Sequence, residues 1–434
     1  MTAGAAKVDI TPVGDVWMDG MVRSHKSVGV HDPLYARALH ISPGVDPGDG
    51  FVIVSVDVCA LKPEFLSVVR LAAQTVTGVP SSSIVIAATH THSGPAAYGY
   101  FNDAETGYVD DLAEKLVAVI KDAFDGAQPA AVGCASGRED TISHYRRLLA
   151  DDGRVVMNWE PYPPERIVRP LGEVDPEVGV LKVVSTDGKP ICLLFNHAGH
   201  PNVLSGDNYL ISADYPGLAA KLLEDEFGGV AMFINGAQGT MDIDGLRDRD
   251  FEGMDRIGHV LQAAVSKTVG AIEPSDQPIR CASIRYEMPS RKITEAECDW
   301  AQGILARTGG TFQPMADGVG DDYKALLYQR LRESQDRDIL VEQSCIAIGD
   351  TAFISFPGEL FTEIGMRIKA DSPFKHTYIL GLANGCVGYV PTRDAVSQGG
   401  YEVDTRPADV AAEDIVVRQS LGLLTGLHRV IQEE

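Results

Sequence analysis

The chain has 434 residues, of which 44% are hydrophobic and 23% charged, and its formal net charge is −24. This composition fits a globular protein with a large core, whereas so much negative charge opposes binding to nucleic-acid phosphates or to an anionic membrane surface. We therefore expect no nucleic-acid and no membrane partner, and the sequence leaves room for a homo-oligomer.

The seven cysteines stand singly, without a CxxC pair. Their number is odd, and Cys59 and Cys192 lie within apolar runs, where a thiol behaves as a small hydrophobe. This pattern is not a disulfide framework and favours a reducing compartment. The N-terminus lacks an apolar core of signal-peptide length, and no apolar run reaches about 18 residues. The sequence thus predicts a cytoplasmic protein.

A predicted strand–helix–strand unit follows the loop-rich residues 1–30. Residues 51–58 and 84–88 have the continuous apolar character of buried strands, and residues 62–76 between them are predicted to be helical. Such units collect functional groups at the C-terminal ends of their strands. We therefore expect an α/β fold with a mixed, largely buried β-sheet flanked by helices, and a metal site at the strand ends.

Two histidines follow the second of these strands, in the segment THTHSGP at 89–95. If the strand continues to its end, His90 and His92 point to the same face, about 6.6 Å apart at two residues of strand rise. One imidazole could then bind a metal while the other reaches the same substrate. A pair of exposed loop histidines is the plainer interpretation, but two in register before a Gly-Pro break favour a site.

Apolar spacing and turn residues define the next elements. Asp214 is expected to cap a helix that has Pro216 in its first turn. The other elements expected in the core are a helix at 108–124, a hairpin of strands at 178–184 and 191–195, a strand at 230–234 and a helix around 257–265.

The region 294–343 differs in character from the rest of the chain. It contains two helical patterns, around 300–306 and 323–334, separated by the Gly-rich stretch 308–320. We interpret it as an insertion or lid on a single catalytic domain of residues 1–434, and its Gly-rich stretch could close over a small ligand.

Polar residues recur beside Gly or Pro where five predicted strands end. Core packing gives no reason for this, and His90, His200, Glu359 and Tyr389 offer ligands of the type that zinc takes. Bound zinc lowers the pKa of a water molecule and polarises a carbonyl, which is hydrolytic chemistry. Taken singly, Glu359 could be a loop carboxylate and Tyr389 a half-buried aromatic. The five segments read THTHSGP, NHAGHP, NGAQGTMD, FPGE and GCVGYVPT.

These segments resemble the neutral/alkaline non-lysosomal ceramidase family, in particular the catalytic domain of its shorter bacterial members. The likeness runs from about residue 5 to residue 405 and includes ISADYPG at 211–217, DPLYARAL at 32–39 and VSVDVCAL at 54–61. The chain ends at Glu434, where full-length ceramidases continue into an immunoglobulin-like domain, and we expect that domain to be absent.

The resemblance implies one zinc ion per chain, with His90, His200, Glu359 and Tyr389 as its ligands. It also implies that His92 and an arginine contact the substrate and the reacting group. Arg146 is the better match for that arginine, and Arg147 is the alternative.

Three further residues are expected on the substrate side: Tyr401, Gln238 and Asp242. Tyr401 matches a substrate-side tyrosine of the family, and Gln238 belongs to the NGAQG segment. Asp242 stands where the family's ceramidases carry a serine that was long assigned as the nucleophile, so a serine-dependent scheme is disfavoured. Ser93 lacks a relay of its own, and His197 either orients His200 or belongs to the core.

Together these features predict a zinc-dependent hydrolase that cleaves an amide (N-acyl) bond with metal-activated water. His92 would be the general acid/base and Arg146 would stabilise the oxyanion. A small soluble substrate is favoured over ceramide, because the negative chain approaches a bilayer against repulsion. The alternatives are an ester or lactone hydrolase, a true ceramidase, and a metal-binding protein that has lost catalysis.

Overall fold

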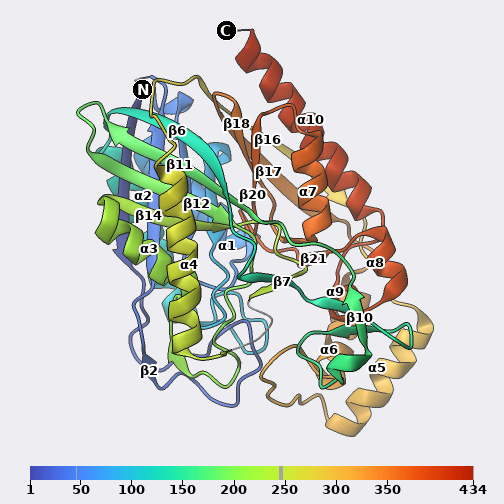
Figure 1. Ribbon diagram of the computed structural model, residues 1–434. Helices are drawn as coiled ribbons and strands as arrows, with labels where there is room; N and C mark the ends of the chain where they lie inside the picture. Colours follow the sequence, from blue (N-terminus) through green and yellow to red (C-terminus); the bar gives the residue numbers. More distant parts are fainter. Residues whose placement is uncertain (45, 244–247, 434) are drawn as a thin grey trace.

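The computed structural model describes residues 1–44, 46–243 and 248–433, and its two largest β-sheets are flanked by helices (Figure 1). The larger sheet has eight strands in the order β14-β12-β11-β6-β1-β3-β4-β5. Its strands are β1 (Thr2–Asp9), β3 (Tyr35–Ser42), β4 (Phe51–Val56), β5 (Ile84–Ala88), β6 (Gln128–Arg138), β11 (Glu177–Ser185), β12 (Pro190–His197) and β14 (Val230–Asn235).

Parallel pairing is confined to the two ends of this sheet, where β4 pairs with β5 and β12 with β14. The pairs between them are antiparallel. The sheet is so strongly curved that β14 contacts β3, β4 and β5, and the Ser55 hydroxyl on β4 donates to the Phe233 carbonyl on β14 at 2.5 Å. Curvature therefore brings the two parallel pairs, which are farthest apart in strand order, against each other.

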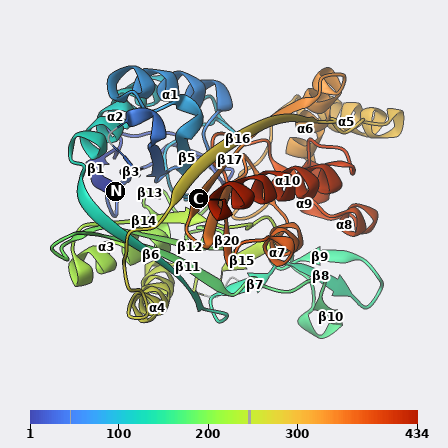
Figure 2. The same ribbon diagram turned by 90° about the horizontal axis from the view of Figure 1, so that it is seen from above.

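Helices cover both outer faces of the curved sheet, as the view from above shows (Figure 2). On one side α1 (Pro63–Thr77) and α2 (Thr106–Asp125) pack their apolar stripes on Val54 and Val56 of β4. On the other side α3 (Asp214–Phe227) and α4 (Phe251–Val269) cover β11, β12 and β14. Phe51 and Ile53 alternate to the inner face, as the two-residue period of a strand requires.

The second sheet has the order β16-β17-β18-β20 and carries α7 and α10 on its outer side (Figure 1). Two helices, α5 and α6, are inserted between its neighbouring antiparallel strands β16 and β17. The bounds are β16 (Ile279–Met288), α5 (Glu295–Thr308), α6 (Asp321–Ser334), β17 (Ile339–Ile348), β18 (Thr351–Ser355), α7 (Thr362–Asp371), β20 (His376–Leu380) and α10 (Ala412–Gln432).

Short strands and helices outside the two large sheets complete the fold. The pairs that matter for the site are β7 with β15 and β19 with β21. These elements are β2 (Gly29–Val30), β7 (Ser143–Tyr145), β8 (Arg147–Ala150), β9 (Val155–Met157), β10 (Ile167–Pro170), β13 (Leu210–Ile211), β15 (Met241–Ile243), β19 (Glu359–Leu360), β21 (Tyr389–Val390), α8 (Arg393–Gln398) and α9 (Tyr401–Thr405).

The predicted α/β class, with a mixed buried sheet flanked by helices, is confirmed, as are the β4–α1–β5 unit and the β11–β12 hairpin. The sequence analysis missed β1, β3, β6 and β16, because partly exposed residues or, in β3, buried polar residues break the apolar pattern. None of the described helices is long and apolar enough to cross a membrane.

Two local predictions are wrong. β5 ends at Ala88, so His90 and His92 do not share a strand face. Asp214 is not the cap of α3 but its first residue, with φ 55°, and Ala213 occupies the capping position. The Asp214 carboxylate accepts from the amides of Tyr215 and Leu204 at 2.7 and 3.3 Å instead.

Candidate metal centre

His90 lies in a sharp turn just beyond β5, with a left-handed φ of 74° that is uncommon for a residue other than glycine. Its amide donates to the Val58 carbonyl at 3.0 Å. Its ring Nδ1 lies 2.7 Å from the Cys59 carbonyl. Since a carbonyl only accepts, Nδ1 carries the hydrogen, and the lone pair of the neutral ring is on Nε2.

His200 follows β12 and is held in the same way, with Nδ1 2.7 Å from the Met241 carbonyl of β15. Glu359 begins β19, and its Oε2 lies 3.4 Å from His90 Nε2 and 3.2 Å from His200 Nε2. All three side chains are buried, and Glu359 Oε2 has no hydrogen-bond partner among the described residues. Three acceptor atoms from segments far apart in the chain thus face one another.

This arrangement suits a divalent cation. Burial and the nearby Arg146 lower the pKa of His200, so that its ring is neutral. Burial raises the pKa of Glu359, but positive charge on His90 and His200, whose place a bound cation would take, holds it well below its usual value. A neutral imidazole and an ionised carboxylate are protonation states that metal binding requires, and carbonyl-bound Nδ1 atoms are the usual outer support of histidine ligands.

A second group that could hold a metal consists of Cys59, His90 and His92. Burial raises the pKa of the Cys59 thiol well above its ordinary value, and a thiol must lose its proton to bind a metal. The ionised carboxylate of Glu359 therefore makes the first group the better metal site.

Tyr389 lies next to Glu359, because the two residues pair directly in the parallel ribbon of β19 and β21. Its hydroxyl accepts from Arg146 Nη2 at 3.1 Å. Burial and the Glu359 carboxylate raise the pKa of Tyr389 well above its ordinary value. Its role as a fourth ligand stays a prediction.

His92 reaches the same place from the loop, with its Nε2 3.2 Å from His90 Nε2. Arg23 Nη2 donates to the His92 carbonyl at 2.8 Å and fixes this turn. A Cβ on Gly20 would stand 2.5 Å from the His92 ring, so only glycine leaves room for it. Burial, His90 and His200 lower the pKa of His92 well below its ordinary value, so its ring is neutral. The sequence analysis missed Arg23 and Gly20.

The structure separates the two candidate arginines. Arg146 faces the centre, with Nη1 3.3 Å from His200 Nε2. Arg147 points away, and its Nη2 donates to the Gly399 carbonyl at 2.8 Å. Both guanidinium groups share the fully buried carboxylate of Glu402, at 2.7 and 2.9 Å. Sequence reasoning missed Glu402, for which the neighbouring Tyr401 was the only signal.

The three residues expected on the substrate side divide into two kinds. Tyr401 lines the cavity beside Tyr389, with the two rings 5.8 Å apart. Asp242 and Gln238 are fully buried and do not line it. The Asp242 carboxylate accepts a hydrogen bond from the Asn158 side chain at 3.3 Å. The side-chain amide of Gln238 has no hydrogen-bond partner in the part of the chain that the structure describes. A substrate role for Asp242 and Gln238 stays a prediction.

His197 does not contact His200 but belongs to the core. Its ring bonds to the Ser143 hydroxyl and to the Glu177 carbonyl, each at 3.0 Å. The Ser93 hydroxyl accepts from Asn208 at 3.0 Å, and no base is paired with it among the described residues.

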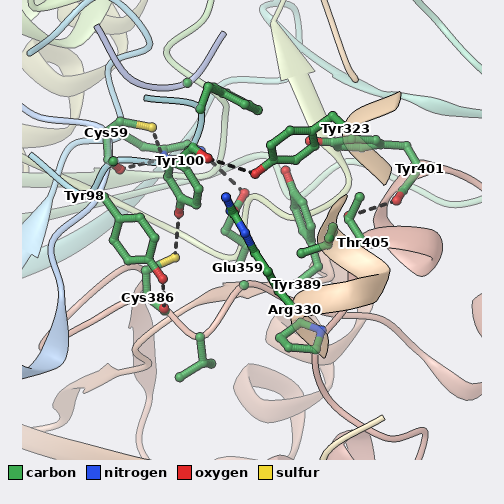
Figure 3. A pocket seen from close by; sticks show the side chains of 18 of the residues that line it. Cys59, Tyr98, Tyr100, Tyr323, Arg330, Glu359, Cys386, Tyr389, Tyr401 and Thr405 are labelled. Atoms are coloured by element: carbon green, nitrogen blue, oxygen red, sulfur yellow. Dashed lines mark hydrogen bonds and ion pairs between the residues drawn. The ribbon is translucent and has the colours of Figure 1, made fainter. Parts of the chain in front are cut away.

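Three of the four candidate ligands line a cavity of about 410 Å³ (Figure 3), whereas His200 and Arg146 do not line it. His90, His92, Glu359 and Tyr389 form one end, and Tyr98, Tyr100 and Phe101 form a wall. The insertion supplies the facing wall through α6, and no residue of its Gly-rich stretch 308–320 lines the cavity. The α6 residues are Tyr323, Leu327, Arg330 and Leu331.

Comparison with known proteins identifies the family to which the chain belongs. The sequence pattern described as neutral/alkaline non-lysosomal ceramidase, N-terminal, matches residues 1–318. The chain belongs to this family. It is 24% identical to the neutral ceramidase of Pseudomonas aeruginosa over 92% of this chain and 68% of that one. Neutral ceramidase B of Dictyostelium discoideum is 28% identical over 46% of this chain and 28% of its own length.

The solved structures agree with this assignment at the level of the fold. The crystal structure of the Pseudomonas aeruginosa ceramidase superposes with a TM-score of 0.75 at 20% identity, over 99% of this chain and 75% of that chain. A ceramidase complexed with C2 gives 0.76 at 19% identity, with the same coverage.

We predict that Glu402→Ala lowers the free energy of unfolding by about 3–5 kcal/mol, because it leaves two guanidinium groups buried without their shared carboxylate. Urea unfolding measures this. Glu295→Ala is the matched control, since it breaks the exposed pair with Arg332, and solvent-screened pairs of this kind add little to stability. Equal losses in the two variants would contradict the role given to Glu402.

Proposed function

We propose that this protein is a zinc-dependent hydrolase that cleaves the amide bond of an N-acyl substrate. The observation that carries the proposal is the convergence of His90 Nε2 and His200 Nε2 on Glu359 Oε2, at 3.4 and 3.2 Å, beside an open cavity that His90 and Glu359 line. Zinc bound there with Tyr389 would acidify a water molecule and polarise the scissile carbonyl.

His92 suits the role of general acid/base. Its neutral ring presents Nε2 to the centre, 3.2 Å from His90 Nε2, and its Nδ1 has no partner among the described residues. It can accept a proton as water attacks the carbonyl carbon and return that proton to the departing amine. The close fit against Gly20 keeps the ring in place.

Arg146 suits the role of oxyanion stabiliser. Glu402 and the Gly239 carbonyl hold its guanidinium at 2.7 and 3.0 Å, so the charge is oriented before substrate binds. A preorganised charge of this kind stabilises the negative oxygen that develops as an amide is attacked. The Tyr389 hydroxyl beside it would share in this or bind the metal.

The proposed chemistry is compatible with several classes of substrate. Relatives of this chain are named neutral ceramidases, and ceramide is itself an N-acyl amide. We favour a smaller and more soluble N-acyl amide, because a net charge of −24 opposes extraction of a lipid from an anionic bilayer. Ester or lactone hydrolysis uses the same carbonyl polarisation and is the second candidate. Seven free thiols support a cytoplasmic location.

The metal-ligand proposal predicts about one zinc per purified chain. His90→Ala and His200→Ala should each lose both zinc and activity, because the remaining ligands no longer enclose the ion. His259→Ala is the control, since that histidine is exposed and bonded to its own helix. Elemental analysis measures the zinc, and full occupancy in His90→Ala would refute the assignment.

The acid/base proposal predicts a different result for His92. His92→Ala should keep its zinc and lose turnover by about two to four orders of magnitude, the range expected when proton-transfer help is removed. Metal content and kcat are measured on the same preparation. Loss of zinc from this variant would contradict the assignment and make His92, in place of His90, the metal ligand.

The substrate proposal predicts that a short N-acyl amide is hydrolysed with a higher kcat/KM than long-chain ceramide in detergent. The test uses zinc-loaded protein and matched acyl chemistry. A tenfold advantage for ceramide would make the protein a ceramidase in the strict sense, and turnover of esters alone would favour the second candidate.

A further inference from the structure

We infer that the substrate of this cavity carries a carboxylate and that Arg330 of α6 binds it. The inference rests on the hydrolase function proposed above and narrows its substrate class to anionic N-acyl amides. Arg330 would be a specificity-determining residue on the insertion, remote in sequence from the metal ligands.

Arg330 is the only lysine or arginine among the described residues that line the cavity. Its side chain leaves α6 and extends into the pocket, with the guanidinium directed inward (Figure 3). The residue is exposed, so a ligand entering from solvent can reach it. The cavity therefore has one positively charged side chain on its wall, that of Arg330.

The guanidinium of Arg330 has no ion pair or hydrogen bond within residues 1–44, 46–243 and 248–433. The other two cations of α6 are paired: Lys324 lies 3.2 Å from Asp321 and 3.3 Å from Asp404, and Arg332 lies 2.6 Å from Glu295. The Arg330 guanidinium is therefore free to bind an acidic group of a ligand, and it points into the cavity (Figure 3).

The tyrosine hydroxyls on the cavity walls formed by residues 98–101 and by α6 already make hydrogen bonds within the protein. The Tyr98 hydroxyl donates to the Cys386 carbonyl at 3.3 Å, and the Tyr100 hydroxyl lies 2.9 Å from Cys386 Sγ. The Tyr323 hydroxyl donates to the Tyr100 carbonyl at 3.0 Å. Their rings thus act as apolar surface. Besides the catalytic end and Tyr401, the wall offers a ligand one strong donor, the Arg330 guanidinium.

A carboxylate fits this donor better than the alternatives do. Guanidinium binds carboxylate through two parallel hydrogen bonds, and the aromatic wall suits an acyl chain. A phosphate with nearly two negative charges would meet one arginine and the carboxylate of Glu359 in the same cavity. A neutral amide such as ceramide has no group that would pair with the arginine.

The test compares two substrates that differ at one group, N-octanoylglycine and N-octanoylethanolamine. Zinc-loaded wild-type protein should prefer the glycine conjugate in kcat/KM by about tenfold or more, the effect of one charge-assisted contact. Arg330→Met, which keeps a similar side-chain length, should raise KM for that conjugate about tenfold and change the ethanolamide less than about threefold.

Arg332→Met is the matched control, because it removes one positive charge from the same helix at a residue that does not line the cavity. It should leave both substrates unchanged, whereas a loss equal to that of Arg330→Met would indicate only the general field of the helix and overturn the inference. Arg330→Lys should recover part of the preference, since lysine keeps the charge without the paired donors.

A binding measurement separates this inference from the hydrolase proposal. Calorimetric titration of N-octanoylglycine should show a Kd about tenfold weaker for Arg330→Met than for wild type. If wild type binds the conjugate through Arg330 but cleaves neither amide, the proposed function fails and the carboxylate site stands. If both amides are cleaved and the Arg330→Met variant keeps the wild-type ratio of kcat/KM, the inference fails and the hydrolase stands.

Discussion

Three buried acceptor atoms, His90 Nε2, His200 Nε2 and Glu359 Oε2, face one another at 3.2–3.4 Å from the carboxylate oxygen to the ring nitrogens. Lone pairs at this distance repel unless a cation lies among them, and burial removes the water that would otherwise solvate the carboxylate. Backbone carbonyls of Cys59 and Met241 fix the ring tautomers. The residues around the centre hold these three acceptor atoms in place and balance their charge.

The buried charges around the centre balance one another. Arg146 and Arg147 share Glu402, and Glu359 provides the second negative charge, so these four side chains sum to zero. Buried ion pairs are costly unless every member is bonded. Here the carbonyls of Gly239 and Gly399 take up further hydrogens of the guanidinium groups. Arg146 can therefore remain charged and fixed beside the site where an amide would react.

The curved sheet explains how residues from four distant segments meet. β5 and β12 are far apart in strand order, yet β14 packs against β5, which brings the loop after β5 to the loop after β12. The separate β19–β21 ribbon adds Glu359 and Tyr389 from the segments that follow β18 and β20 of the second sheet. α6 belongs to the insertion between β16 and β17 and supplies a cavity wall without contributing a candidate ligand. Substrate preference can thus change along this helix while the metal centre stays the same.

The sequence by itself determined the class of the fold and the residue types of the centre. Apolar runs fix β4, β5 and β14 as buried strands, and the placement of His, Glu and Tyr beyond strand ends, with the family resemblance, marks His90, His200, Glu359 and Tyr389. These signals are local, and local periodicity is visible in a sequence. Pairings across the fold are not local, so the sequence left them open.

Only the tertiary structure shows that Arg146 and Arg147, which are neighbours in the chain, point to different places, with Arg146 beside His200. It also introduced Glu402, set Asp242 and Gln238 behind the cavity wall, and turned His90 out of the strand into a left-handed conformation. Each of these outcomes depends on contacts between segments far apart in the chain, such as the 256 positions from Arg146 to Glu402. The physical reason is that burial and charge pairing are properties of the packed core, whereas a sequence displays only what is adjacent along the chain.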